Sequence, residues 1–508
     1  MASQSATLSE TSQLDVHGWD TTETTSLLPP WDNDSELSIL KSTDASSLRA
    51  TMFWEEMRTI PRYALPVFGS QILEFSMMFI SVISIGHLST MTLAAVSLGS
   101  MTANVTGLSV LQGLASALDT LLPSAYTSPQ PQLVAVVMAF AVGPIALVWF
   151  SAEAILLALK QDLEVAHLAA VYLRWLSLGL PAFAYNCISR RYFQSQGLFF
   201  VQTRIISFVA PVNVVVNYLL VWGPKPIRLG FIGAPIASVL SFYLISLISF
   251  IHVMYFTPRT TWHPLSAKMF TNLGLLVRLG LSGIAQLVSE WWGWEFAVLA
   301  ASFMGPITLA SQSILTTTAA MAFQLSFAIA NATSIRIGNL LGEKNATRAG
   351  VAAYTSLVVE KYVLPCTILV ILRNSWATLF NNDPEVVKVV AAVIPLIALF
   401  QIVDSNAAVT QGILRARGKQ FIGALLNLSA YYVIGLPLGV WLAFRRDLGL
   451  NGLWIGLTTT LVYNSAIGTI LCFKTDWNEE VVRVVKRLAE EERLRKVADE
   501  ENRPLSGR

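Results

Sequence analysis

Thr92-Leu93-Ala94-Ala95-Val96-Ser97 returns later in the chain as Thr308-Leu309-Ala310-Ser311-Gln312-Ser313. Two further pairs repeat at a similar spacing: Gln196-Gly197 with Arg417-Gly418, and Leu229-Gly230-Phe231-Ile232-Gly233 with Leu448-Gly449-Leu450-Asn451-Gly452. The offsets of the three pairs are 216, 221 and 219 residues. A shared offset in a mostly apolar chain indicates two related halves. Internally repeated membrane bundles are typical of secondary transporters, whose substrate site lies between the repeats.

The composition is that of a membrane protein rather than a soluble one. The chain is 54% hydrophobic and only 13% charged, whereas a soluble domain carries about 25% charged residues. Apolar runs of about 20 residues, long enough to cross the hydrocarbon of a bilayer, recur along the chain. A net charge of +2 gives no support for nucleic-acid binding. Cys187, Cys366 and Cys472 lie in apolar segments without metal-ligand spacing, so we expect no metal site and no cofactor.

The apolar runs predict an all-α polytopic fold of twelve spans, six in each half. The predicted spans are 62–85, 92–117, 133–158, 168–190, 201–222, 230–256, 273–303, 308–335, 354–373, 387–412, 420–443 and 450–473. With an even number of spans, the halves are parallel repeats related by an axis along the membrane normal. The corresponding organisation is a disordered tail over 1–58, bundles over 59–258 and 273–474, a linker over 259–272, and a charged tail over 475–508. In that last tail, apolar residues among many charged ones predict an amphipathic helix leaving the membrane.

The distribution of basic residues orients the bundle. With both tails inside, the short cytoplasmic loops carry about twelve Lys and Arg, and the opposite loops carry about half that number. The positive-inside rule therefore predicts that both termini and the linker are cytoplasmic.

We select four of the carboxylates within the predicted spans as candidates, because charge is expensive there. Glu290 and Glu295 lie in the middle of span 7, Asp404 in span 10 and Glu74 in span 1. Each charged side chain near the bilayer centre costs about 2.5–3.5 kcal/mol on insertion scales. The three spans carry no Lys or Arg at matching depth, so structural ion pairs are a weak explanation. Burial disfavours the ionised form, which predicts carboxyls that bind and release protons.

Tryptophans beside these acids suit an organic cation. Trp291, Trp292 and Trp294 surround Glu290 in the sequence, and indole faces attract cations. Glu290 and Glu295 are about 140° apart around an ideal helix. Either Gly293 permits a local break, or the two acids have different roles, with Glu290 as the coupling residue.

Other polar residues within the spans are candidates for the cavity wall. The ones we select are Gln71, Gln312, Asn406 and Tyr431. Such residues also form hydrogen bonds between helices, worth about 0.6 kcal/mol each in a membrane. Asp119 closes span 2, where it is expected to anchor a helix end rather than bind substrate.

Several motifs follow one another along the spans. They are Gly86-His87-Leu88, Ser116-Ala117-Leu118-Asp119-Thr120-Leu121, Glu290-Trp291-Trp292-Gly293-Trp294-Glu295, Arg336-Ile337-Gly338-Asn339-Leu340-Leu341-Gly342 and Gln411-Gly412-Ile413-Leu414-Arg415-Ala416-Arg417-Gly418. In this order they resemble the multidrug and toxic compound extrusion (MATE) family, in particular a fungal-like eukaryotic branch. The resemblance implies a V-shaped pair of six-helix bundles that exports organic compounds in exchange for protons or sodium. It also implies that Glu290 carries coupling and cation recognition, assisted by Glu295 and Asp404.

The chain departs from animal members of that family in two ways. It has Thr308 where some of them have a glutamate early in span 8, and a proline-rich stretch, Leu122–Pro129, after Asp119. Specificity therefore need not be that of the animal organic-cation exporters. Glu74 is also unusual for the branch.

The sequence hypothesis is thus an antiporter that exchanges protons for small organic cations, xenobiotics or secondary metabolites, and not an enzyme. We expect a monomer in the plasma or vacuolar membrane; Glu23-Thr24-Thr25-Ser26-Leu27-Leu28 resembles a vacuolar sorting signal. The alternatives are a sodium-coupled exporter, a lipid-linked-substrate flippase, and a receptor or scaffold without transport.

Overall fold

The computed structural model describes residues 45–86, 88–124, 130–256, 273–362, 371–380 and 383–501, and every regular element in these ranges is helical. The N-terminal half contains α2 (Ala45–Gly86), α3 (Thr90–Ala103), η1 (Asn104–Leu108), α4 (Ser109–Ala115), α5 (Ala117–Ser124), α6 (Gln130–Phe150), α7 (Ala152–Ala158), α8 (Leu163–Ser177), α9 (Leu180–Ser195), α10 (Phe199–Trp222), η2 (Gly230–Ile232) and α11 (Gly233–Phe256). The C-terminal half contains α12 (Leu273–Ser302), α13 (Pro306–Gly342), α14 (Ala346–Tyr362), α16 (Arg373–Trp376), η5 (Ala377–Leu379), α17 (Pro384–Ala416), α18 (Gln420–Leu428), η6 (Ser429–Gly435), α19 (Leu436–Arg445), α20 (Gly449–Phe473) and α21 (Trp477–Glu501).

The helices confirm the predicted fold class. Within the described residues, seven helices are long and apolar enough to cross a membrane, or nine if each of two bent pairs is one span. The bent pairs are α6–α7, with an angle of 59°, and α8–α9, with an angle of 56°. The remaining three predicted spans fall on α2, α12 and α14. The predicted linker over 259–272, His87 and Cys366 lie outside the described residues.

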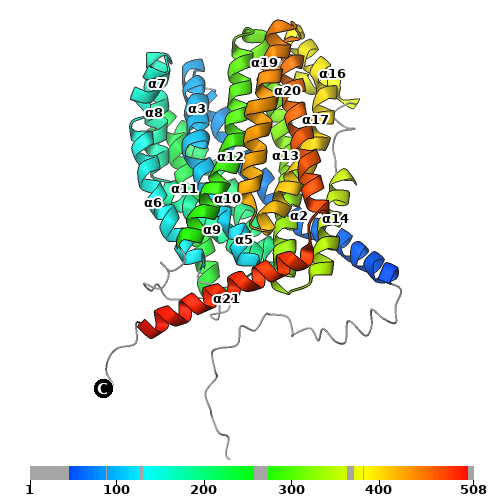
Figure 1. Ribbon diagram of the computed structural model, residues 1–508. Coiled ribbons are helices and arrows are strands. Elements are labelled where there is room, and N and C mark those ends of the chain that lie inside the picture. Colours follow the sequence, from blue (N-terminus) through cyan, green and yellow to red (C-terminus); the bar gives the residue numbers. More distant parts are fainter. Residues whose placement is uncertain are drawn as a thin grey trace, which may run out of the picture.

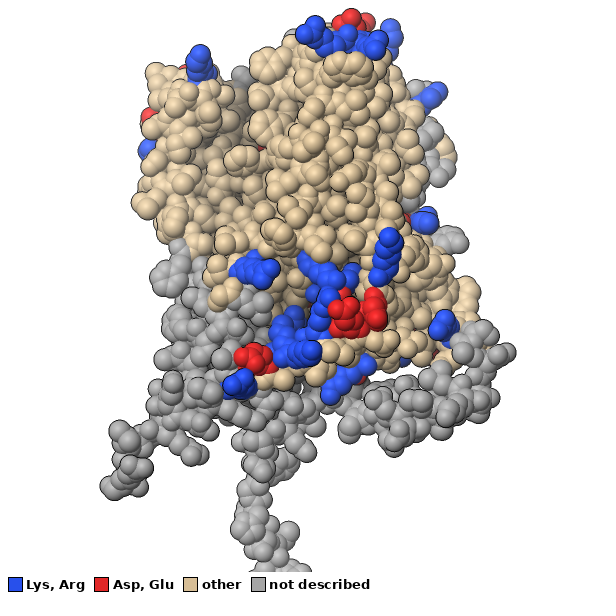
Figure 2. All heavy atoms as spheres, in the orientation of Figure 1, with Lys and Arg blue, Asp and Glu red and all other residues tan. Residues whose placement is uncertain are grey.

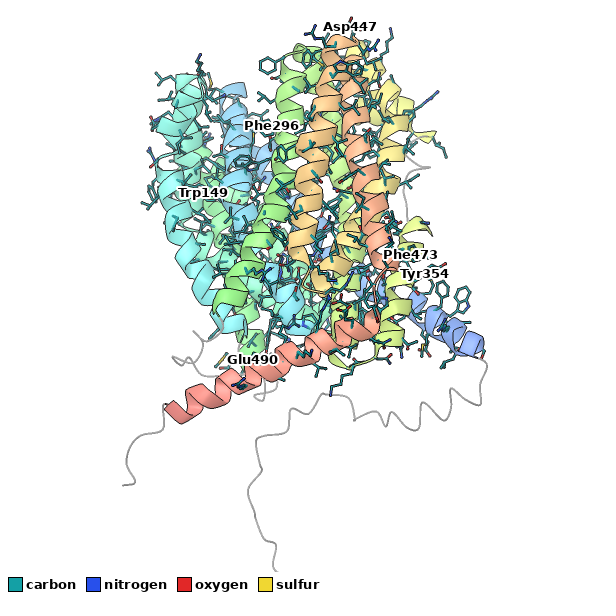
Figure 3. All side chains as sticks on the ribbon, in the orientation of Figure 1. Trp149, Phe296, Tyr354, Asp447, Phe473 and Glu490 are labelled. Carbon is teal, nitrogen blue, oxygen red and sulfur yellow. The ribbon has the colours of Figure 1, made fainter. Side chains whose placement is uncertain are left out.

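The two bundles form a V that is closed at the end of the molecule carrying α21, here called the tail end (Figure 1). At this end α4 packs against α12, and α5 packs against α13 and α17. Figure 2 shows the surface hollowed between the two lobes toward the other end, and a broad band without charged side chains across the face in view. Figure 3 places Asp447 at the far end and Glu490, on α21, at the tail end.

Each bundle has its own apolar core, and a third core joins them at the tail end. Trp149 lies at 0% exposure in the N-terminal core, and Trp454 does so in the C-terminal core. The third core packs Ile60 and Ala64 of α2 against residues of α13 and α14, such as Ile329. The first turns of α2 therefore pack with the C-terminal bundle, whereas the rest of α2 packs along α10.

The prediction of a disordered tail over 1–58 is wrong for its last part, because α2 begins at Ala45. Glu56, in this stretch, is fully buried and accepts hydrogen bonds from Arg336 Nε at 2.9 Å and Arg348 Nε at 2.8 Å. Burial alone would raise the pKa of Glu56, but the hydrogen bonds and charges of the two guanidinium groups outweigh burial and lower this pKa from its ordinary value of 4.5. A polar segment thus folds because its carboxylate meets two partners far along the chain.

Replacing Glu56 by Ala is expected to destabilise the protein by about 3–5 kcal/mol, because the change leaves buried guanidinium groups without their partner. The folded-state pKa of Glu56 lies below its unfolded value, so this contribution is present above pH 4.5 and is lost as the pH falls through the folded pKa. Thermal unfolding in detergent at several pH values measures both effects. Glu55→Ala is the matched control: Glu55 pairs with Arg348 at 2.9 Å but is 52% exposed, so a loss of about 0–1 kcal/mol is expected. Equal losses in the two variants would contradict this account.

The predicted amphipathic helix after the last span is confirmed as α21, which runs beneath both bundles in Figure 1. Its Glu480 is 3% exposed and accepts hydrogen bonds from Arg417 Nη2 and Lys419 Nζ, each at 2.8 Å. Burial opposes the shift, yet the hydrogen bonds from Lys419 and Arg417 lower the pKa of Glu480. The ring of Trp477 lies 5.9 Å from the Arg417 guanidinium. These contacts hold the start of α21 against the C-terminal bundle.

Candidate functional site

Glu290 lies in the middle of α12, which is a single helix from Leu273 to Ser302. The alternative of a local break at Gly293 is therefore wrong. Gly293 instead allows close packing, because a Cβ atom at this position would lie 2.5 Å from Cδ1 of Tyr431. Tyr431 itself, in η6, is 2% exposed. The side of α12 next to Glu290 is thus pressed against a buried tyrosine of the same bundle.

Asp404, on α17, completes an acidic site inside the C-terminal bundle. Asp404 is 6% exposed and Glu290 is half-buried. Asp404 lies within electrostatic range of Glu290, and Tyr431 lies within range of both. In the described part of the chain, neither acid takes part in an ion pair. The structure therefore brings together Glu290, Asp404 and Tyr431, three residues that the sequence placed on separate spans.

The tryptophans of α12 face different surroundings. Trp294 packs in the C-terminal core, with ring centroids 5.5 Å from Phe400 and 5.8 Å from Trp454. Trp292 is 42% exposed, and Trp291 is half-buried. Trp294 is thus a packing residue beside the acids, and it shares no face of the helix with Trp292. Glu295 is half-buried on α12, about 140° around the helix from Glu290.

Glu74 has a basic partner from another span, so the expectation that ion pairs are a weak explanation is wrong for this acid. Arg190 of α9 forms an ion pair with Glu74, and its Nη1 donates to Oε1 of Gln71 at 2.9 Å. Arg415, at the end of α17, also lies within electrostatic range of Glu290 without pairing with it. Glu74 and Gln71 thus form a polar cluster of the N-terminal bundle, separate from Glu290 and Asp404.

The other polar candidates are engaged in hydrogen bonds inside the C-terminal bundle. Gln312 Oε1 accepts a hydrogen bond from Trp454 Nε1 at 2.8 Å. Asn406 Nδ2 donates to Glu360 Oε1 at 3.1 Å. Glu360, on α14, is 2% exposed and was missed in the sequence, although the cost of charge within an apolar span applies to it as well.

Beneath the acidic site, hydrogen bonds and an ion-pair cluster close the two bundles together at the tail end. Asp119 of α5 accepts a hydrogen bond from Arg191 Nε at 2.9 Å and lies 3.7 Å from Arg415 Nε of the other bundle. Gln420 Nε2 donates to the carbonyl of Ser116 at 2.9 Å, and Thr120 donates to the carbonyl of Arg415. Asp119 thus joins α5 to α9 and to the last turn of α17, so it links the two bundles rather than only anchoring the end of its own span. That Asp119 does not bind substrate stays a prediction.

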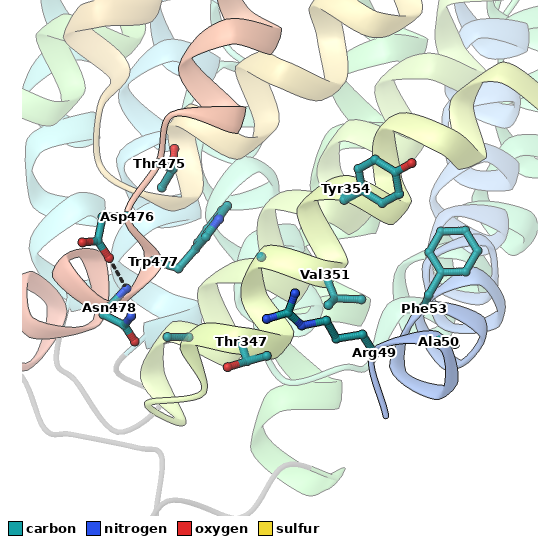
Figure 4. Close-up of a pocket in the computed structure, with 12 residues that line it drawn as sticks. Arg49, Ala50, Phe53, Thr347, Val351, Tyr354, Thr475, Asp476, Trp477 and Asn478 are labelled. Carbon is teal, nitrogen blue, oxygen red and sulfur yellow. Dashed lines mark hydrogen bonds between the residues drawn. The ribbon is translucent and has the colours of Figure 1, made fainter. Parts of the chain in front are cut away.

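A separate pocket of about 700 Å³ opens at the tail end, between the starts of α2, α14 and α21 (Figure 4). Its lining includes Arg49, Phe53, Tyr354 and Trp477. None of the carboxylates or cavity residues predicted from the sequence lines this pocket. The candidate site is therefore the acidic site of α12 and α17, inside the C-terminal bundle.

Two divergent helical bundles, a band without charged side chains and acids inside one bundle define a membrane transporter. The family model for MatE matches residues 66–219 and 282–441. The chain belongs to the MatE family, whose named members include multidrug and toxin extrusion proteins, and it is a transporter rather than an enzyme.

Relatives occur in fungi and animals. The chain is 35% identical to the uncharacterized transporter C4B3.13 of Schizosaccharomyces pombe, over 84% of this chain and 81% of that protein. It is 31% identical to multidrug and toxin extrusion protein 1 of Danio rerio, over 87% of this chain and 77% of that protein. The crystal structure of the eukaryotic MATE transporter AtDTX14 superposes with a TM-score of 0.81 at 27% identity, covering 86% of this chain and 99% of that one.

Proposed function

We propose that this transporter exports small organic cations in exchange for protons, and that Glu290 and Asp404 bind either the protons or the cation. The observation that carries the proposal is the pair itself: two carboxylates within electrostatic range of each other, without an ion-pair partner among the described residues. Such a pair must gain positive charge to be stable in a medium of low dielectric constant. A cation or protons can supply this charge, and competition between them produces exchange.

The closed tail end supports an alternating-access cycle. We propose that both tails are cytoplasmic, as the basic loops predict, so that the present state opens toward the opposite side of the membrane. Protons then enter from that side, displace the cation from the acids, and favour return to the state that is open at the tail end. Because a ligand shifts a conformational equilibrium only through its differential affinity, the acids must change their surroundings between the two states.

Reconstitution of the full-length protein into sealed vesicles tests this function. A fluorescent quaternary ammonium dye is loaded, and its flux is followed under a pH gradient alone or a sodium gradient alone. We expect flux that requires the pH gradient and is absent from empty vesicles. Flux driven by sodium alone would replace proton coupling with sodium coupling. Absence of flux under both gradients would reject the export of this cargo class.

A further inference from the structure

Glu360 of α14 is a buried acid that the proposed exchange does not use. Its Oε1 atom accepts the hydrogen bond from Asn406 Nδ2 at 3.1 Å, but Oε2 is buried with no hydrogen-bond partner in the described part of the chain. A buried polar atom without a partner is costly, so most such atoms in folded proteins are bonded. If Glu360 served solely to position Asn406, its second carboxylate oxygen would not be needed. An amide or hydroxyl oxygen could accept the hydrogen bond from Asn406 equally well.

The hydrogen bonds of Asn406 connect Glu360 to α17, the helix that carries Asp404. Asn406 lies two residues beyond Asp404 on α17, and its Oδ1 accepts hydrogen bonds from Ser465 and Thr469 of α20, each at 2.9 Å. The hydrogen bond to Glu360 therefore fixes the carboxyl of α14 against the segment of α17 that carries Asp404. Asp404 also lies within electrostatic range of Glu360.

Other charges near Glu360 are few in the described residues. Lys361, its neighbour on α14, is exposed and within electrostatic range. The helices α2, α13 and α21 also pack against α14. Glu56 of α2 contacts α14 at Arg348, and Trp477 of α21 contacts Gly350. Those contacts lie at the start of α14, roughly 15–18 Å along the helix from Glu360. Among the described residues of the acidic site, Asp404 is thus the acid whose protonation responds to the charge of Glu360.

We propose that Glu360 is a third proton-binding residue of the transport cycle, coupled to Asp404 through its charge. This inference rests on the proposed proton exchange. In each step the O–H bond of a carboxyl breaks, the proton passes to water and a carboxylate remains, or the reverse occurs. No other bond changes. An ionised Glu360 favours the protonated form of Asp404, and a protonated Glu360 allows Asp404 to ionise and attract the cation. Glu360 is therefore a positioning residue, because it acts through the charge of Asp404.

The pH dependence of gradient-driven dye flux in Glu360→Gln tests the proposal. Glutamine keeps the size of the side chain and an oxygen that accepts from Asn406, but it cannot ionise. Because the variant lacks a negative charge near Asp404, a lower pH is needed to protonate Asp404. We expect the midpoint of the pH profile to move to lower pH by about one unit, the size of a charge–charge interaction at intermediate effective dielectric.

Two control variants separate charge from structure. Ser465→Ala removes one hydrogen bond from Asn406 but no titratable group, so its pH midpoint should match that of the parent. Glu360→Asp keeps a carboxyl and should restore the parent profile. An unshifted midpoint in Glu360→Gln, or an equal shift in Ser465→Ala, would overturn the proposal. A parent whose flux ignores the pH gradient would instead reject the proposed function itself.

A measurement on the unaltered protein covers the case in which Glu360→Gln does not assemble. Hydrophobic carbodiimides react with protonated carboxyls inside membranes, and mass spectrometry locates the modified peptide. We expect modification of Glu360 at low pH that disappears as the pH rises. Modification that does not change with pH, or none at any pH, would overturn the proposal.

Discussion

Replacing Glu290 by Gln is expected to reduce gradient-driven flux of the quaternary ammonium dye to the level of empty vesicles. Glutamine has nearly the same size, so the packing of Tyr431 on Gly293 should persist. The variant loses both the negative charge that attracts the dye and the carboxyl that binds the proton. Since exchange requires that one group bind either ligand, the loss removes dye binding and coupling together. Flux from vesicles with an imposed pH gradient, at matched protein content, measures the effect.

Glu295→Gln is the matched control for this prediction. Glu295 lies on the same helix and is also half-buried, but it points away from Glu290. The variant removes one negative charge from α12, as Glu290→Gln does. If any loss of charge from this helix reduced the flux, both variants would show the reduction. We expect Glu295→Gln to keep most of the flux. Full flux in Glu290→Gln would remove this residue from the mechanism and leave Asp404 as the coupling acid. Equal loss in both variants would point to disruption of α12.

Replacing Gly283 by Ala is expected to disfavour the state in which the tail end is closed, and so to slow transport strongly. A Cβ atom at this position would lie 2.4 Å from the carbonyl oxygen of Gly113 and 2.1 Å from Oγ of Ser116. The hydroxyl can rotate, but the carbonyl belongs to the backbone of α4, so the two bundles must separate. Overpacking of this kind costs about 1–3 kcal/mol, which changes the ratio of the two states by roughly 5–150-fold.

Dye flux and the reactivity of a cysteine introduced at Thr120 together test the prediction. Thr120 is fully buried at the tail end in the present state, so its replacement should react faster with a water-soluble maleimide when the bundles open there. Gly274→Ala is the control on the same helix, since no described atom lies within 4 Å of a Cβ added at Gly274. We expect the control to match the parent in both measurements. Unchanged reactivity and flux in Gly283→Ala would show that the tail-end contact does not limit the cycle.

The sequence was sufficient for the fold because hydropathy is a local property. Twelve apolar runs of membrane-spanning length determined the number and order of the spans, and the repeated segments divided them into two bundles. The high cost of charge in a bilayer also identified Glu290 and Asp404 without any knowledge of the packing. Applied throughout span 9, the same reasoning would have included Glu360.

Ion-pair partners that lie far apart in the sequence could not be predicted from it. Glu74 was grouped with Glu290 because its own span has no base at matching depth, yet α9 supplies Arg190, which lies 116 residues away in the chain. Glu56 looked like part of a polar tail, yet Arg336, 280 residues away, makes its burial favourable.

The sequence by itself thus determined which segments enter the membrane and which acids demand an explanation, because both follow from the transfer of each residue out of water. Only the tertiary structure decided which acids are neutralised and which are not. It separated Glu74, paired with Arg190, from Glu290 and Asp404, which form no ion pair among the residues that the structure describes. The physical reason is that the energy of a buried charge depends on the groups within a few ångströms of it, and those groups come from other helices.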